Sequence, residues 1–137
     1  MLGRDEVDFV RQWGPKIGTD AARLKWSGTQ LLGRGYFLNF AWIPSVIAGA
    51  KLAWPVLLSL GILLGLASAA HCVLAGLKFR DANRMASQEL GLRLGFGHVA
   101  PPPREPDHYQ AWCRRYGVTP YTAITPQADQ LGEAGLG

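Results

Sequence analysis

The feature of this 137-residue sequence that most restricts its fold is an uncharged run from Leu52 to Leu77. As an α-helix these 26 residues would extend about 39 Å, more than the roughly 30 Å hydrocarbon core of a bilayer. A second uncharged run, residues 36–50, precedes it, and only Lys51 separates the two. A buried helix in a soluble protein is the alternative, but so short a chain has little mass to enclose such a helix on every side. The run therefore predicts a membrane-spanning helix.

An export signal is a second interpretation of the same stretch. The segment KLAWPVLLSLGILLGLASA combines a cation, an apolar core and an Ala-Ser-Ala tripeptide typical of a cleavage site. Fifty residues precede it, however, and they include the other uncharged run. A lipoprotein signal is also disfavoured, because His71 stands directly before Cys72, where a small residue is needed. The position of the run favours an uncleaved span.

Cations gather on both flanks of the two uncharged runs. The twenty residues before Tyr36 and the sixteen after Leu77 hold four each: Lys16, Arg23, Lys25, Arg34, Lys78, Arg80, Arg84 and Arg93. The positive-inside rule places both flanks in the cytoplasm. This pattern predicts a multi-pass protein of the cell membrane with both termini cytoplasmic. A single span with an interfacial segment is the alternative, and it would leave equal cationic loads on opposite sides.

The remaining patterns divide the chain into four parts, and the predicted fold class is a small all-α integral membrane protein. Residues 1–35 are expected to form a cytoplasmic or interfacial amphipathic segment of two short helices, separated by GPKIG at 14–18, with Thr19 capping the second. Residues 36–77 form the transmembrane hairpin, about 36–51 and 55–77. A helical stalk covers 78–94. Residues 95–137 form a proline-containing linker and a flexible polar tail with a short helix.

Small residues recur every four positions on both predicted spans. A turn about Pro55 would set 49 level with 61, 45 with 65, and 41 with 69. The predicted helix-packing residues are therefore Ala41, Ser45, Gly49, Gly61, Gly65 and Ala69. Small side chains let helix backbones approach closely in lipid. The same faces could instead contact a second copy of the chain or another membrane protein.

Aromatic and cationic residues stand at the expected membrane boundaries. The predicted interfacial anchors are Trp26, Arg34, Tyr36, Lys51, Trp54, Lys78 and Arg80. Asn39 and His71 would lie level with each other. At 100° per residue, however, both lie far round their helices from the small-residue faces, so a bonded pair is not favoured. The roles of Asn39, His71 and Cys72 stay open.

Motifs for chemistry are absent from the sequence. There is no glycine-rich phosphate loop, no G-x-S-x-G and no H-E-x-x-H, and the histidines and cysteines form no close zinc-ligand pair. We therefore expect no enzyme activity, catalytic residue, metal or cofactor. The stretch YQAWCRRYGVTPYTAI, residues 109–124, resembles the middle of a helix-turn-helix DNA-binding unit, but Pro126 would truncate its second helix, so nucleic acid is not a favoured partner.

These patterns predict a small non-enzymatic membrane protein whose main partner is the lipid bilayer. Arginine outnumbers lysine ten to four, which is typical of a GC-rich bacterial or phage gene. We expect a membrane-anchoring or assembly component of a bacterium or phage. The first alternative is a holin-like phage membrane protein, by analogy of size and span number. The second is a membrane-tethered DNA-binding regulator acting through residues 107–125.

Overall fold

The structure, a computed structural model, describes residues 3–121. Within that range 79% of the residues are helical and no strand is present, so the predicted all-α class is confirmed. The helices are α1 (Arg4–Ile17), α2 (Thr19–Lys51), α3 (Pro55–Leu90) and α4 (Pro106–Tyr116). The chain divides into two compact units, Met1–Pro101 and Pro102–Gly137, and α4 alone of these helices belongs to the second.

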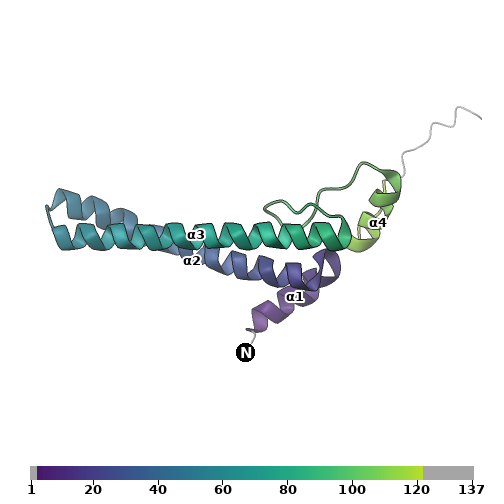
Figure 1. Cartoon of the computed structure of the whole chain (residues 1–137), viewed down its shortest axis with the longest axis horizontal. Coiled ribbons are helices and arrows are strands. Elements are labelled where there is room, and N and C mark those ends of the chain that lie inside the picture. The colour runs from purple at the N-terminus through teal and green to yellow at the C-terminus, as the bar shows by residue number, and fades with distance from the viewer. Residues whose placement is uncertain (1–2, 122–137) are drawn as a thin grey trace, which may run out of the picture. The chain divides into compact units, whose positions relative to one another are not determined.

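The first unit is dominated by a long antiparallel pair formed by α2 and α3. The two helices lie side by side along their lengths, and α1 packs against the beginning of α2 (Figure 1). At 1.5 Å per residue, the 33 residues of α2 and the 36 of α3 each extend about 50 Å or more. Each helix is therefore longer than the roughly 30 Å hydrocarbon core of a bilayer.

The N-terminal segment differs from the predicted two short helices. The first helix passes through Gly14 and Pro15 and ends only at Gly18, whose φ of 95° redirects the chain. Pro15 lies in the last turn of α1, where its missing N–H costs a single hydrogen bond and the ring disturbs only one preceding turn. Thr19 is the first residue of α2 and makes no capping hydrogen bond, so its predicted role as N-cap was wrong.

The predicted division between an interfacial helix and the first span is also absent. One helix, α2, runs through Gly33, Gly35 and Pro44 without interruption. Packing along α3 stabilises this continuous helix, and that outweighs the weak helix preference of the two glycines. Near Pro44, the Ser45 hydroxyl donates to the carbonyl oxygen of Ala41 at 2.7 Å. The continuous helix sets residues 19–35 and 36–51 on one axis.

The turn between the two long helices is tight. It spans residues 52–54, and the N–H of Trp54 donates to the carbonyl of Gly49 at 2.9 Å. Ala53 has a left-handed φ of 49°, a conformation that costs a non-glycine residue about 1 kcal/mol or more. Pro55 then begins α3, where its fixed φ suits a first helical residue and its missing N–H is not needed.

The described part of the second unit is one short helix and its flanks. Gly117, in the left-handed conformation, ends α4, and the ring of Trp112 packs between Tyr109 and Tyr116. Residues 118–121 are not helical. The rest of the helix-turn-helix resemblance, with Pro126, and the end of the polar tail lie outside the described residues.

Candidate functional site

The contact line between α2 and α3, here called the seam, has a single register. At five levels a glycine on one helix meets a larger residue on the other, and one of these levels pairs Gly35 with Cys72. A Cβ atom added at Gly61 would lie 2.8 Å from the backbone nitrogen of Val46, and one at Gly49 would lie 2.6 Å from that of Leu58. The remaining two of these levels pair Gly65 with Trp42 and Gly28 with Phe79. Because these glycines have no side chain, the facing helix can approach closely at each of them.

The seam repeats every seven residues. The buried residues in α3 include Gly61, Ser68, Ala75 and Ala82. On α2 the same period joins Ala21, Gly28, Gly35, Trp42 and Gly49, all of them buried except the half-buried Trp42. A period of seven keeps two helices in contact when they wind slowly around each other, as in coiled coils. Here the buried positions are mostly glycine, alanine and serine rather than leucine. Small residues of this kind are typical of helices that approach closely in lipid.

The predicted register of the small residues was wrong by three residues. Gly61 meets Val46 and the carbonyl carbon of Ser45 rather than Gly49, and Gly65 meets the Trp42 ring rather than Ser45. Ala41 and Ala69, at the third predicted level, are exposed. The prediction centred the turn on Pro55, but Pro55 already belongs to α3 and the turn is centred near residue 53. Each residue of α2 therefore faces a position three residues earlier on α3 than predicted.

A buried polar cluster lies midway along the seam. The hydroxyl of Ser68, which is 3% exposed, donates to the carbonyl oxygen of Gly35 at 2.7 Å. It also lies 2.9 Å from Oδ1 of Asn39, which in turn accepts from the Trp42 indole N–H at 2.6 Å. These bonds satisfy groups that would be costly to bury alone. The cluster fixes the rotation of both helices at this level.

His71 does not join that cluster. Its Nδ1 donates to the carbonyl oxygen of Ala67, one turn earlier on α3, at 2.8 Å. Asn39 is thus bonded to Ser68 and Trp42 and not to His71. The sequence reasoning missed Ser68 and Trp42, although the seven-residue spacing of Ser68 from Gly61 and Ala75 could have identified it. Cys72 is exposed, and its sulfur lies beside Gly35.

The outward faces of both helices are apolar and exposed between residues 36 and 77. The side chains involved are large: Tyr36, Phe37, Phe40, Ile43, Ile47, Leu52, Trp54, Val56, Leu60, Ile62, Leu63, Leu66, Val73, Leu74 and Leu77. Phe37 is 75% exposed and Phe40 73%. Of the helices in the described residues, only α3 is long and apolar enough to cross a membrane by composition, with a mean hydropathy of 2.1 over its best window. Only 11% of that window is buried, so the protein itself does not enclose α3.

The predicted interfacial anchors occupy three kinds of position. Those exposed to the surroundings are Arg34, Tyr36, Lys51, Trp54 and Arg80. Lys78 is half-buried beside Gly28, and the Trp26 ring packs on Phe9 of α1 with centroids 5.2 Å apart. Counted at 1.5 Å per residue, Arg34 stands about 29 Å from the tip of the hairpin, close to the thickness of a hydrocarbon core.

A second buried polar site closes the other end of the pair. Lys25 of α2 is 1% exposed, and its ammonium group donates to the carbonyl oxygens of Gly95 (2.9 Å) and Gly97 (2.6 Å). The Phe79 ring lies 5.6 Å from the same nitrogen. From α3, the side-chain oxygen of Asn83 accepts from the N–H of Leu94 at 2.9 Å. Residues 91–100 are therefore docked on the helices, whereas the sequence assigned 95–100 to a proline-containing linker.

His98 completes this docking through its ring. The imidazole contacts Phe9 and Trp13 of α1, with centroids 4.9 and 5.3 Å away, and its Nδ1 is buried without a hydrogen-bond partner in the described part of the chain. Burial lowers the pKa of His98, and the positive charge of Lys25 lowers it further. Burial likewise lowers the pKa of Lys25. The docked loop therefore favours a neutral His98.

We expect acid to release this loop. Because the docked state lowers the pKa of His98 below its ordinary value of about 6.5, the undocked state binds the proton more readily, so docking is complete above pH 6.5 and weakens as pH falls below it. Amide protection factors for residues 92–100 should drop between pH 7.5 and pH 5.5. In His98→Phe, which keeps a ring but cannot titrate, they should be independent of pH. The same drop in His98→Phe would assign the effect to another group.

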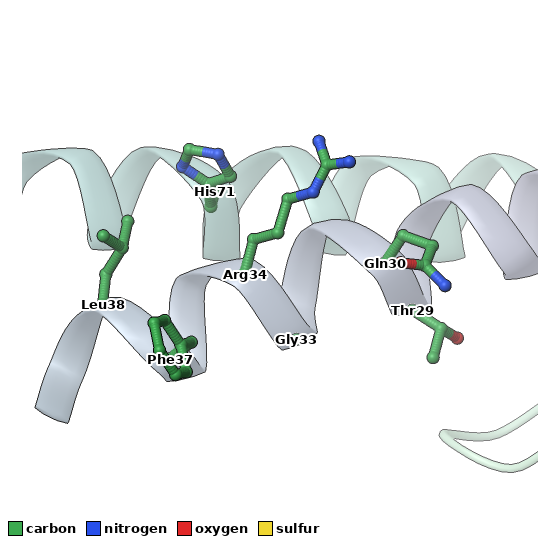
Figure 2. A pocket seen from close by; sticks show the side chains of 7 residues that line it. All are labelled: Thr29, Gln30, Gly33, Arg34, Phe37, Leu38 and His71. Atoms are coloured by element: carbon green, nitrogen blue, oxygen red, sulfur yellow. The ribbon is translucent and has the colours of Figure 1, made fainter.

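A shallow groove lies beside the seam near the level of Arg34. Its walls come mainly from α2, and His71 of α3 completes it (Figure 2). The residues that line it are Thr29, Gln30, Gly33, Arg34, Phe37, Leu38 and His71. Arg34 and His71 extend toward the same side of the pair (Figure 2). A Cβ atom added at Gly33 would meet nothing within 4 Å, so the groove is open at that position.

The described residues contain no group of three or more His, Cys, Asp and Glu side chains arranged to hold a metal ion. No protein-family model, curated protein or solved structure matches this chain. The features of the described chain that bear on function are the seam, the outward apolar faces and the two polar sites.

Proposed function

We propose that this chain is a non-enzymatic integral membrane protein whose α2–α3 hairpin inserts into the bilayer and serves as a membrane anchor or assembly component. The observation that carries the proposal is the inverted distribution of side chains over residues 36–77. Large apolar side chains point outward, while the seam buries glycine, alanine and serine. Soluble monomers rarely expose an apolar surface of this extent.

Water and lipid would act on this hairpin in opposite ways. In water, burial of apolar surface stabilises a fold by about 25 cal/mol per Å², and a seam of small residues contributes little of it. In lipid the outward side chains are solvated by acyl chains, and close backbone packing holds the helices together. Within the seam, the hydroxyl of Ser68 donates to the carbonyl of Gly35, and the side-chain oxygen of Asn39 accepts from the indole of Trp42. The arrangement is thus suited to lipid.

The hairpin geometry also supports a second crossing by α2. Its uncharged part is bounded by Arg34 and Lys51 and contains Asn39 and Pro44, which lowers its own hydropathy. It nevertheless packs along α3, so both helices would share one depth in the bilayer. Lys51 and Trp54 would then reach the far surface, and the cation-rich ends of both helices would remain in the cytoplasm.

Cysteine accessibility tests this topology. In a background with Cys72→Ser and Cys113→Ala, a membrane-impermeant maleimide should label Leu52→Cys at the tip in intact cells. It should label Gln88→Cys, exposed near the end of α3, only after permeabilisation. Labelling of both positions only after permeabilisation would show that the tip does not cross, and labelling of Gln88→Cys in intact cells would show that the orientation is wrong.

A further inference from the structure

We propose that the groove around Arg34 binds the phosphodiester headgroup of an anionic phospholipid; this inference rests on the proposed membrane insertion of the hairpin. The groove is polar at one end and apolar at the other, and the order of the two ends matches a lipid molecule. Gln30 and Arg34 supply the polar groups at one end, whereas His71 of α3 lies near the level of Phe37 and Leu38 (Figure 2). Phe37 and Leu38 lie one turn closer to the tip, deeper in the expected bilayer.

The polar end has donors available for a phosphate. Arg34 makes no ion pair within the described residues and presents five N–H groups that suit phosphate oxygens. Gln30 adds a side-chain amide from the preceding turn. The Nδ1 of His71 donates to the carbonyl of Ala67, which leaves Nε2 of the neutral ring as an acceptor, so His71 is not counted as a donor. The hydroxyl of Thr29 is used on the carbonyl of Lys25 at 2.9 Å and is not counted as a donor.

The apolar end and the missing side chain at Gly33 make room for an acyl chain. Gly33 stands one turn from both Thr29 and Phe37 on the same face of α2, and nothing fills the space above it. Phe37, at 75% exposed, walls this space toward the tip. A lipid whose phosphate meets Arg34 could therefore run its chain past Gly33 and along Phe37, which line the same groove.

Charge selects an anionic lipid over a zwitterionic one. Between Asp20 and Asp81 the sequence contains no acidic residue, while its cations there are Arg23, Lys25, Arg34, Lys51, Lys78 and Arg80. A choline headgroup would bring a cation toward Arg34 with no carboxylate nearby to receive it. An anionic headgroup meets only favourable charge. Basic pockets at the cytoplasmic ends of membrane helices bind anionic headgroups for this reason.

The test compares two lipids on the full chain in phosphatidylcholine vesicles. Trace spin-labelled phosphatidylglycerol or spin-labelled phosphatidylcholine is added, and electron paramagnetic resonance gives the fraction of each that the protein immobilises. Wild type should prefer phosphatidylglycerol. Arg34→Gln should reduce this preference about tenfold, as expected when a bound phosphate loses a charge-assisted hydrogen bond. Equal immobilisation of the two lipids by wild type would overturn the proposal.

Two further variants separate the groove from general attraction of charge. Gly33→Leu fills the open space and keeps Arg34, and it should lower the preference as Arg34→Gln does. Arg80→Gln removes one exposed cation outside the groove and should leave the preference unchanged. An unaltered preference in Gly33→Leu, or an equal loss in Arg80→Gln, would show that no groove site exists.

Two controls are needed. The first identifies the source of the phosphate, and the second separates failure of the lipid site from failure of membrane insertion. Soluble glycerol phosphate at 10-fold excess over the labelled lipid should not displace it; displacement would assign the groove to a free phosphate compound and overturn the lipid proposal. Co-flotation of the protein with vesicles is measured on the same sample. Protein that floats without lipid preference contradicts only the lipid site, whereas protein that does not float contradicts membrane insertion as well.

Discussion

Replacing Gly61 by alanine is expected to destabilise the α2–α3 hairpin by about 1–3 kcal/mol, the usual cost of inserting one methyl group into a filled contact. The added Cβ would lie 2.8 Å from both the backbone nitrogen and a methyl carbon of Val46. A backbone atom cannot move aside as the end of a side chain can, so the helices must separate. The free energy of unfolding is measured by titrating SDS into a mild-detergent solution of the protein. Trp42 emission reports the separation, with the other tryptophans replaced by phenylalanine.

Gly76→Ala is the matched control, because it makes the same substitution on the same helix. A Cβ atom at Gly76 would meet nothing within 4 Å. Alanine forms helix better than glycine by up to about 1 kcal/mol, and both variants receive that benefit. The control should therefore be neutral or slightly stabilising. Equal free energies of unfolding for the two variants would show that the seam is not closely packed.

Gly35→Cys is expected to form a disulfide with the native Cys72 in most molecules under mild oxidation. A Cβ atom at position 35 would lie 3.1 Å from the sulfur of Cys72, within the narrow range of separations that a disulfide requires. In a Cys113→Ala background, the bond is detected as loss of both thiols to a maleimide-polyethylene glycol mass label. Intramolecular bonding keeps the protein monomeric on a non-reducing gel.

Gly33→Cys gives the comparison for this crosslink. Position 33 is on the same helix but opens to the surroundings, so it should leave both thiols free. The experiment also distinguishes the observed register from the one predicted from small-residue spacing, which places residue 75 rather than 72 opposite residue 35. Little crosslinking in Gly35→Cys would favour the predicted register. Bonds formed only between chains would move this face to an interface between copies.

Some features of the protein could be predicted because they depend on neighbouring residues. The all-α class follows from the helical periodicity and from an uncharged run long enough for a membrane-spanning helix. The apolar character of α3 follows from the absence of charge between residues 52 and 77. The placement of Pro55 at the start of α3 follows from its fixed φ and missing N–H. Each of these depends on local composition, so no knowledge of distant contacts was needed.

Helix ends at glycine and proline were harder to predict. The sequence placed a break at GPKIG, but α1 continues to Ile17, and α2 passes through Gly33, Gly35 and Pro44. The local preference of such residues is worth about 1 kcal/mol for glycine and about 3 for proline. The free energy gained from contact with a partner helix over many residues is larger than these preferences. Local signals therefore marked possible ends but did not decide among them.

The sequence by itself determined that the chain is helical and that one long segment avoids charge. Only the tertiary structure decided which residues of the two long helices meet. A turn centred near residue 53 instead of 55 moves every facing pair by three positions, which sets Val46 and Trp42 against glycines and bonds Ser68 to Asn39. It also brought Lys25 to the carbonyls of Gly95 and Gly97, some seventy residues away. Such contacts depend on the path of all the chain that lies between the two residues. The residue pattern near each position carries no information about that path.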